Sequence, residues 1–324
     1  TLQSQSRYVT AVITGSYTLA ACTKTALASG TAPTSPTNLS ATEFGYFDNY
    51  SIQTIFAPEW TALADHQAME VYCSGRNDCA GVIAATYATT TSDIVTTYGA
   101  LNISKSFLAG YFNWVKVPNY TSGGTQQWIP GLGAIIGAYY IKQMMAEGGN
   151  PFVPPGGMRT SLLGILGQKY ELSSAAIEVM VHTNAWNVIQ YYKGKGFVVR
   201  TSRTQSSTSK HYSIHIRRSI NFLISTFRNT LGEYEQRQNN PRTRAQLQNA
   251  INLFLSSQYS KGMFEKEGGF ENNVRVTCDE TNNDVNVRQG RQLVVDIYMN
   301  FAEVAETVYV NLVQMTGGFD VNVI

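Results

Sequence analysis

Residues 273–315 read NVRVTCDETNNDVNVRQGRQLVVDIYMNFAEVAETVYVNLVQM and contain three segments with the pattern of β-strands. The segments are Val274–Cys278, Leu293–Met299 and Thr307–Val313. Successive side chains in the second segment fall on two faces with a period of two, which is typical of a half-buried strand. A sheet at this end of the chain offers an edge on which a strand of another subunit can pair. The residues that we expect to form an edge strand for such inter-subunit addition are Val308, Val310 and Leu312.

The polar residues between the first two segments are typical of a turn. Asn and Asp side chains favour turns because they hydrogen-bond to the nearby backbone. Asp279, Glu280 and Asp284 also resemble the start of a calcium-binding loop, but the glycine and the terminal glutamate of that motif are missing. We therefore interpret Cys278–Asn283 as a structural turn and predict no metal site.

The composition of this 324-residue chain suits a protein that covers part of its surface with copies of itself. Hydrophobic residues make up 43% of the sequence and charged residues only 14%, against about a quarter in an average globular protein. The net charge of +2 is far below that of a protein that binds nucleic acid through its phosphates. The composition favours self-assembly and gives no indication of a nucleic-acid partner.

Charged residues form two blocks of opposite sign. Residues 193–244 contain eleven basic and two acidic residues, whereas residues 265–324 contain ten acidic and four basic residues. These blocks either neutralise each other inside one domain or form a face for a partner protein of opposite charge. The residues that we expect to form a basic surface for a partner or a neighbouring subunit are Arg217, Arg237, Arg242 and Arg244.

Other features exclude several classes of protein. The four cysteines, Cys22, Cys73, Cys79 and Cys278, lack the spacing of a disulfide scaffold or a zinc site, so we expect free thiols. No apolar run reaches the ~18 residues of a membrane span, and the start of the chain has no signal-peptide pattern. Because the chain begins at Thr1 and not at Met, we expect a fragment, a processed form or a trimmed product.

Residues 44–205 alternate between strand-like and helix-like patterns, which predicts a mostly parallel sheet with helices on its faces. The predicted strands are Ser51–Phe56, Ala80–Tyr87, Lys105–Val117, Val188–Tyr192 and Gly196–Thr201. The predicted helices are Trp60–Gly75, Thr91–Leu101, Leu132–Glu147 and Ser174–His182. The polar segment Thr204–Lys210 is the expected linker to the next domain.

Residues 206–324 are expected to form a smaller α+β domain. It begins with a strand at His211–Arg217, continues with helices at Arg218–Leu231 and Arg242–Ser260, and ends with the strands described above. Residues 1–43 are rich in Thr, Ser and Ala, and we interpret them as a strand and loop segment left from an extra N-terminal domain.

The glycine-rich run Gly131–Gly137 is the best candidate for a nucleotide site, because such a run brings a helix N-terminus close to a pyrophosphate. Its spacing is GxGxxxG, Pro130 precedes it, and no acidic residue follows before Glu171 except Glu147. Close packing of helix on sheet also explains these glycines. We therefore keep an α/β nucleotide-binding enzyme as the alternative function and predict no cofactor.

The histidines and hydroxyl residues do not form a recognisable catalytic motif. His211 and His215 are four residues apart, which suits a metal on a helix, but the local pattern favours a strand and no carboxylate is near. No G-x-S-x-G nucleophile motif is present. We predict that the protein is not an enzyme and has no catalytic residues.

Several motifs in order resemble the contractile tail sheath proteins of phages and related injection systems. The matching segments are YFNWVKV at 111–117, WIPGLGAIIGAY at 128–139, GFVVRTSRT at 196–204, the segment from Ile214 to Leu231, and CDETNN, GRQLVVDI and AEVAETVYV at 278–283, 290–297 and 302–310. Two departures are Arg200 and Thr201, which stand where the family has Trp and Gly. The family's usual prolines are also missing around Phe301 and Val304.

The resemblance implies a subtilisin-like α/β domain without a catalytic triad at 44–205, followed by the C-terminal α+β sheath domain at 206–324. It also implies stacked hexameric rings around a tail tube, joined by strands donated from terminal arms, which contract to drive the tube through the host envelope. The implied partners are other copies of the chain, the tube protein, and baseplate and tail terminator proteins. The implied location is the virion tail, after synthesis in the host cytoplasm.

The same resemblance assigns the expected basic surface to contact with the tube or a neighbouring subunit. Charge reversal at Arg242 and Arg244 is expected to loosen the extended sheath. We further expect this chain to lack one or both arms and to remain a monomer in isolation.

Overall fold

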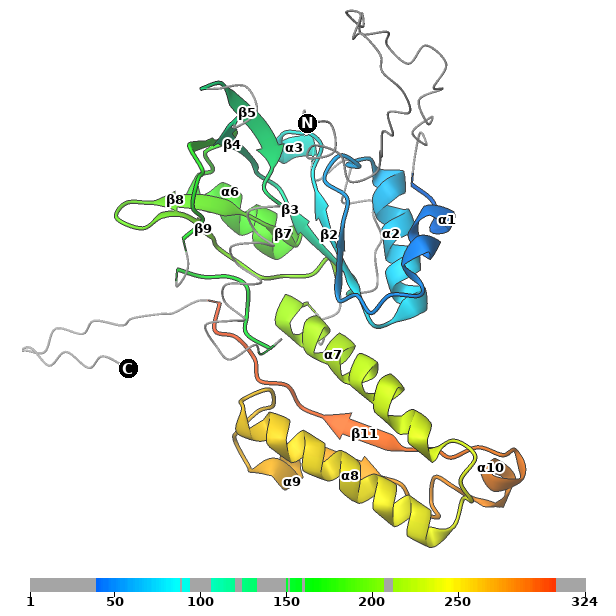
Figure 1. The fold of residues 1–324 in the computed structure, drawn as a ribbon. Coiled ribbons are helices and arrows are strands. Elements are labelled where there is room, and N and C mark those ends of the chain that lie inside the picture. Colours follow the sequence, from blue (N-terminus) through cyan, green and yellow to red (C-terminus); the bar gives the residue numbers. More distant parts are fainter. Residues whose placement is uncertain are drawn as a thin grey trace, which may run out of the picture. The chain divides into compact units, whose positions relative to one another are not determined.

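The computed structural model describes residues 39–87, 89–93, 106–119, 124–132, 150, 152–158, 161–206 and 212–306 (Figure 1). The chain divides into two compact units, Thr1–Thr37 and Asn38–Ile324, and all described residues belong to the second. Most of the expected segment 1–43, and the strand expected at Thr307–Val313, therefore lie outside the described residues.

A parallel sheet forms the centre of the first half of this unit. Its strands are ordered β1-β2-β3-β7, and every neighbouring pair is parallel. Their bounds are Thr54–Phe56, Ala80–Ala84, Leu108–Tyr111 and Trp186–Asn187. Strand β2 has the sequence AGVIA and is almost fully buried, as expected for a strand covered on both faces. The prediction of a mostly parallel sheet with helices is confirmed.

Helix α2 (Leu63–Arg76) connects β1 to β2 and packs on the sheet. Asp65 begins the helix by accepting hydrogen bonds from the backbone amides of Leu39 and Ala62. The helix ends at Asn77, which has a left-handed φ of 63°. Its inward face carries Met69 and Cys73, which belong to the core on this side of the sheet. The short helix α1 (Ala41–Phe44) packs against α2.

The single long strand expected at Lys105–Val117 is wrong. The chain leaves β3 after Tyr111 and begins β4 (Trp114–Pro118) in a different sheet. Asn113 causes the break: its side chain accepts from the Ile189 amide at 3.0 Å and donates to the Tyr170 carbonyl at 3.3 Å. These bonds turn the backbone out of the first sheet, although the residues on both sides have high β propensity.

A second, antiparallel sheet follows with the order β5-β4-β6. Its other strands are β5 (Gln126–Pro130) and β6 (Gly167–Gln168). A β-hairpin of β8 (Ile189–Tyr192) and β9 (Gly196–Val199) follows directly after β7 (Figure 1). Between these parts lie α6 (Ser174–Glu178) and one π-helical turn, Val179–Thr183, in place of the continuous helix expected at Ser174–His182.

The strand expected at His211–Arg217 is also wrong, because α7 already begins at Ile214 and runs to Thr230. The alternation of Ile214, His215 and Ile216 imitates a strand over a few residues. No Gly or Pro interrupts the sequence from Ile214 to Leu231, however, so the helix begins at Ile214, with Ser213 as its N-cap. Ser213 is extended and pairs with Arg203 in a single β-bridge.

The end of the described chain is a small α+β layer beside α7 and α8 (Pro241–Ser260). Asn240 caps α8 by accepting from the Thr243 amide at 2.9 Å, and Pro241 occupies the first turn. Strands β10 (Val274–Thr277) and β11 (Asp296–Met299) pair antiparallel. The short helices α9 (Phe270–Asn273) and α10 (Val285–Gln289) complete the layer.

Three hydrophobic clusters hold these parts together. Two lie around the parallel sheet, and the third is built from α7, α8 and the β10–β11 ribbon, with Leu247, Leu255 and Phe264 among its most buried members. Cys73, Cys79 and Cys278 are buried free thiols, as predicted, whereas Cys22 lies outside the described residues. In the described part of the chain, no helix has the length and apolar character of a membrane span.

Candidate assembly surfaces

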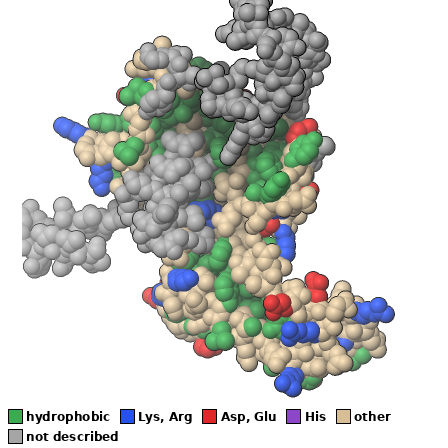
Figure 2. All heavy atoms as spheres, in the orientation of Figure 1, with side chains coloured by type: hydrophobic (Ala, Val, Ile, Leu, Met, Phe, Trp, Pro, Cys, Tyr) green, Lys and Arg blue, Asp and Glu red, His purple; other side chains and the backbone are tan. Residues whose placement is uncertain are grey.

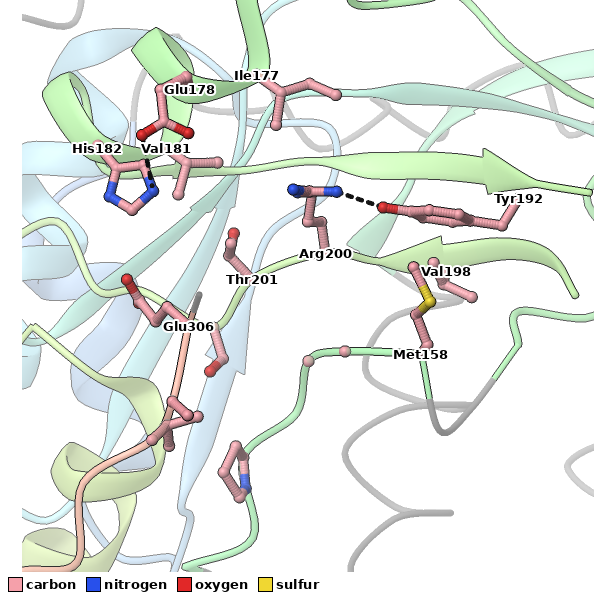
Figure 3. A pocket seen from close by; sticks show the side chains of 16 residues that line it. Met158, Ile177, Glu178, Val181, His182, Tyr192, Val198, Arg200, Thr201 and Glu306 are labelled. Atoms are coloured by element: carbon pink, nitrogen blue, oxygen red, sulfur yellow. Dashed lines mark hydrogen bonds and ion pairs between the residues drawn. The ribbon is translucent and has the colours of Figure 1, made fainter. Parts of the chain in front are cut away.

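A cavity of about 580 Å³ lies where the β8–β9 hairpin, the π-helical turn and the segment 304–306 meet (Figure 3). Charged and apolar side chains share its wall. The labelled residues in Figure 3 are Met158, Ile177, Glu178, Val181, His182, Tyr192, Val198, Arg200, Thr201 and Glu306.

Three residues of the cavity wall, Glu178, His182 and Glu306, belong to an ion-pair network centred on Arg203. Arg203 Nε donates to both carboxylate oxygens of Glu306, at 2.9 and 3.2 Å, and Arg203 Nη2 lies 2.8 Å from Nδ1 of His182. The other ring nitrogen of His182 lies 3.4 Å from Glu178. The hydrogen bond to Glu306 raises the pKa of Arg203 above its ordinary value, so this cation stays charged. The network fixes the last described residue of the chain to the body of the unit.

Polar side chains of the cavity form hydrogen bonds within the protein. Arg200 donates to the Tyr192 hydroxyl, and Thr201 donates to the Asn187 side chain at 3.1 Å. Because both ring nitrogens of His182 already have partners, it does not activate a nearby hydroxyl. Across the described ranges, no group of three or more His, Cys, Asp or Glu residues has the geometry of a metal site. The ion pairs around Arg203 therefore attach the segment that ends at Glu306 to the rest of the unit.

The β10–β11 ribbon carries an edge for strand pairing. The Asn300 amide donates to the Asn273 carbonyl at 2.9 Å, and the Glu265 amide donates to the Asn300 carbonyl at 3.0 Å, so both of these partners lie on one side of β11. Hydrogen-bonding directions alternate along an antiparallel strand, so the N–H and C=O groups of Ile297, Met299 and Phe301 point to the opposite side. Within the described residues, no strand pairs with that side.

The other edge of the ribbon is different. The alternation directs the backbone of Val276 outward from β10, and its carbonyl accepts a hydrogen bond from the Gln248 side chain on α8 at 2.9 Å. A side chain of the unit therefore occupies one acceptor on this edge. The β11 edge is the better candidate for pairing with another chain.

The turn interpretation of Cys278–Asn283 is confirmed. Asn283 is fully buried, and its side chain makes hydrogen bonds of 2.9 and 2.8 Å to the amide and the carbonyl of Val294. Asn282 donates to the Thr277 carbonyl at 2.7 Å and to Asp296 at 3.0 Å. The side-chain hydrogen bond from Thr281 lowers the pKa of Asp279. These groups stabilise the connection between β10 and β11.

The expected basic surface is wrong for two of its four members. Arg217 and Arg244 are only 8% and 2% exposed, whereas Arg237 and Arg242 are exposed. Arg217 donates to the Ser106 hydroxyl at 2.7 Å and lies over the Phe107 ring, and burial lowers its pKa to about 10. Arg217 therefore points into the core and not to the surface. The spacing of charged residues along the helix does not distinguish these two orientations.

Arg244 also has an internal role. It donates to the Asn239 side chain at 3.0 Å and lies 3.5 Å from Glu280, so it ties α8 to the turn before α10. Arg244 comes from the basic block and Glu280 from the acidic block. For this pair, the two blocks therefore neutralise each other inside one domain. A reversal at Arg244 would therefore perturb the subunit itself and cannot test an assembly contact.

Other predicted positions are described only in part. Residues 133–137 of the glycine run and the proposed edge residues Val308, Val310 and Leu312 lie outside the described residues, as does His211. Leu132 is buried in the core of the second cluster. His215 lies on α7, its Nε2 is 3.0 Å from the Ala302 carbonyl, and burial lowers its pKa. It connects the helix to the segment that leads out of β11.

Periodicity and spacing in the sequence do not predict the pairing of Arg203 with Glu306. They are separated by 103 positions, and only the fold brings them together. The one available signal is that both lie in segments that match family motifs, GFVVRTSRT and AEVAETVYV.

Solved structures of contractile machines have the same fold. A chain in the baseplate of the anti-feeding prophage is 17% identical, with a TM-score of 0.68 over 85% of this chain and 72% of that chain. A chain in the contracted PVC sheath complex of an extracellular contractile injection system is 16% identical, with a TM-score of 0.70 over 84% and 72%.

A crystal structure of a sheath tail protein from Desulfitobacterium hafniense is 11% identical, with a TM-score of 0.53 over 73% of this chain and 52% of that chain. No protein-family model and no curated protein sequence matches the chain. The chain therefore has the fold of contractile sheath proteins, and the resemblance found in its sequence motifs is confirmed at the level of the fold.

Proposed function

We propose that this chain is a structural, non-enzymatic subunit of a contractile tail sheath. The observation that carries the proposal is the shared fold with sheath chains over most of the sequence. In this proposal, six copies form a ring, the rings stack around a tail tube, and contraction drives the tube through the host envelope. The partners are other copies, the tube protein, and baseplate and terminator proteins, in the tail of a virion or a related particle.

The proposed domains are a subtilisin-like α/β domain without a triad at 44–205 and the C-terminal sheath domain at 206–324. Two observations support this division. The parallel sheet with its crossover helix α2 lies in the first range, and the third hydrophobic cluster is built almost entirely from the second. A β-α-β connection such as β1-α2-β2 is the usual unit of such a sheet.

Strand addition at the β11 edge is the proposed link between subunits. The outward N–H and C=O groups of Ile297 and Met299 offer the backbone pairing that an extended arm needs, and apolar neighbours in the third cluster give the sheet a solid backing. Backbone hydrogen bonds of this kind can hold while subunits rotate as rigid bodies. Val308, Val310 and Leu312 remain the proposed edge strand for inter-subunit strand addition.

Two further groups fit the same function. The Arg203–Glu306 pair holds the last described residue on the body of the unit, directly before the segment proposed for strand addition. The exposed Arg237 and Arg242 remain the proposed contacts to the tube or to a neighbouring subunit. In this proposal their charge steers assembly more than it adds affinity.

A proline at Met299 tests the acceptor edge. Its amide points away from β10, so Met299→Pro removes a donor for the incoming strand while the Arg275–Tyr298 pair inside the ribbon is kept. Val276→Pro is the matched control, because the backbone of Val276 points outward on the opposite edge. Electron microscopy of the intact gene product with its partners should show hollow tubes for the wild type and the control, and free subunits for Met299→Pro.

The two outcomes that would contradict the proposals differ. If the wild-type product forms no tube or ring with its partners, the sheath function is refuted. If tubes form normally with the Met299 variant, and circular dichroism shows both variants folded, strand addition at β11 is refuted while the sheath function stands.

A further inference from the structure

Three exposed aromatic residues lie in the segment that precedes the edge strand β1, two of them on the 3-10 turn Gly45–Phe47. Tyr46 and Tyr50 are 79% and 65% exposed, and Phe47 between them is also exposed. Large aromatic side chains on a surface are typical of the centre of a protein interface. Figure 2 shows hydrophobic side chains gathered in the region of α1 and α2, with acidic side chains nearby. We call Tyr46, Phe47 and Tyr50 the aromatic loop.

The backbone of this loop is held in place by Arg76 at the end of α2. The guanidinium donates to the Phe47 carbonyl at 2.6 Å and to the Tyr50 carbonyl, and the Tyr72 hydroxyl donates to Asp48 at 2.9 Å. Asp78 in turn accepts from Arg76 at 2.6 Å. A loop fixed before it meets a partner loses less conformational entropy on binding.

Asp78 also connects the loop to the C-terminal half of the unit. Its second carboxylate oxygen accepts from Arg228 of α7 at 2.9 Å, and Arg228 donates to the Arg76 carbonyl at 3.1 Å. Burial alone lowers the pKa of Arg76, but the hydrogen bonds with Asp78 and Tyr72 outweigh burial and raise it. The aromatic loop is thus a fixed feature of the surface.

The stretch of sequence that contains the loop is mostly acidic. Residues 39–93 contain seven acidic residues and one basic residue, Arg76. Asp65 and Asp78 are buried, whereas Glu43, Asp48, Glu59 and Glu70 have accessible side chains. Arg228 of α7, whose side chain is 54% exposed, is the basic neighbour of this stretch, and Asp78 pairs with it.

The opposite edge of the sheet has the complementary character. Strand β7 is the last in the order β1-β2-β3-β7 and leads directly into the β8–β9 hairpin. Residues 189–203 contain four basic residues and no acid. Lys193, Lys195 and Arg200 are exposed, and Figure 2 shows Lys and Arg side chains at this end of the molecule.

Apolar side chains accompany these bases. Tyr191 is exposed on β8 and packs edge-on against Phe197 of β9. The exposed Leu163 follows Leu162, whose amide bonds to the Phe197 carbonyl at 2.7 Å. Lys195 reaches the carbonyl of the exposed Met158 at 3.2 Å. We call this hairpin with Leu163 and Met158 the basic hairpin.

We propose that the aromatic loop of one copy of this chain contacts the basic hairpin of the next copy. The two surfaces lie on opposite edges of one sheet, have opposite charge and both expose apolar side chains. A contact between two different surfaces of identical subunits is heterologous, and it repeats around a ring or along a helix. The contact adds to the proposed strand exchange and does not depend on it, because no terminal arm contributes to it.

The contact predicts that the chain self-associates without any partner protein. This differs from the expectation, drawn from the sequence, that the isolated chain is a monomer. In sedimentation velocity at increasing concentration, the sedimentation coefficient should rise and should fall back when salt is added, because salt screens the charged part of the contact. Zero-length carbodiimide cross-linking of a mixture of ¹⁴N and ¹⁵N chains should join Lys193 or Lys195 to Glu43, Asp48, Glu59 or Glu70 in mixed-isotope pairs.

Matched variants identify the surfaces. Tyr46→Ser with Tyr50→Ser, and Lys193→Glu with Lys195→Glu, should each weaken self-association by about tenfold or more. Leu253→Ser and Lys261→Glu, at exposed positions on and just after α8, are the controls and should leave it unchanged. Combining Lys193→Glu and Lys195→Glu with Glu59→Lys and Glu70→Lys should restore association.

Two results would overturn the contact. One is a chain that stays monomeric at all concentrations and gives no mixed-isotope cross-link. The other is association that the loop and hairpin variants do not weaken more than the controls. Either result leaves the sheath function untouched, because tubes formed with the partner proteins test that function separately.

Discussion

The anchor between Arg203 and Glu306 makes a measurable prediction about the end of the described chain. Glu306→Gln keeps the size of the side chain but removes its charge. The two side chains are 16% and 21% exposed, and both Nε and Nη2 of the guanidinium donate to the carboxylate. Hydrogen bonds to charged groups contribute about 1.5–3 kcal/mol. Because both side chains are partly exposed, we take the lower end, about 1.5 kcal/mol.

This cost applies to local opening of the segment 302–306, not to unfolding of the whole unit. A loss of about 1.4 kcal/mol raises the open population about tenfold. Proteolysis under native conditions follows the open population when opening is fast. Cleavage by a non-specific protease within residues 302–306, located by mass spectrometry, should therefore become about ten times faster in Glu306→Gln.

Glu303→Gln is the matched control. Glu303 lies in the same segment, and in the described part of the chain it makes no ion pair with Lys or Arg. If cleavage in Glu306→Gln is no faster than in Glu303→Gln, the pair does not anchor the segment. Unchanged thermal unfolding of both variants would show that any difference is local.

Two further predictions concern the body of the unit. Burial lowers the pKa of His66 to about 4, below its unfolded value of about 6.5, so the folded state disfavours the charged ring and stability is lost as the pH falls through that window. Urea unfolding should show about 2 kcal/mol less stability at pH 5 than at pH 7, and His66→Leu should lose that part of the difference; an equal pH dependence in the variant would contradict it. Gly81→Ala should destabilise the chain by about 1–3 kcal/mol in thermal unfolding, because its Cβ would lie 2.5 Å from Met69 Sδ and 2.6 Å from Leu108 Cδ2. Gly75→Ala on α2, where nothing lies within 4 Å, is the control and should not destabilise; equal effects would show that crowding is not the cause.

The sequence predicted long elements better than their ends and their breaks. The predicted helix Arg242–Ser260 agrees with α8 to within one residue, since α8 begins at Pro241. The agreement is close because the spacing of its apolar residues and its N-cap residue are both local features of the sequence. The break at Asn113 was missed because its cause, the Ile189 amide, lies 76 residues away. The strand predicted at His211–Arg217 is wrong because the alternation of Ile214, His215 and Ile216 is too short to distinguish the period of a strand from that of a helix.

The candidate surfaces divide in the same way. The ribbon β10–β11 and its turn were predictable, because alternation and Asn-rich turns are written locally. Burial of Arg217 and Arg244 was not, since a charged residue on an amphipathic helix has no local mark of the side that it faces. The Arg203–Glu306 pair and the aromatic loop depend on contacts between distant segments, which periodicity does not reveal.

Asn187 at the end of β7 has a mechanical consequence. Its side chain is fully buried, donates to the carbonyls of Gly110 and Arg203 at 3.0 and 2.7 Å, and accepts from the Arg203 amide at 2.7 Å. The hairpin that starts two residues later is therefore fixed at its root to β3 through Gly110 and to the segment after β9 through Arg203. The orientation of the hairpin relative to the sheet is thus set by buried side-chain hydrogen bonds as well as by the short connection between β7 and β8.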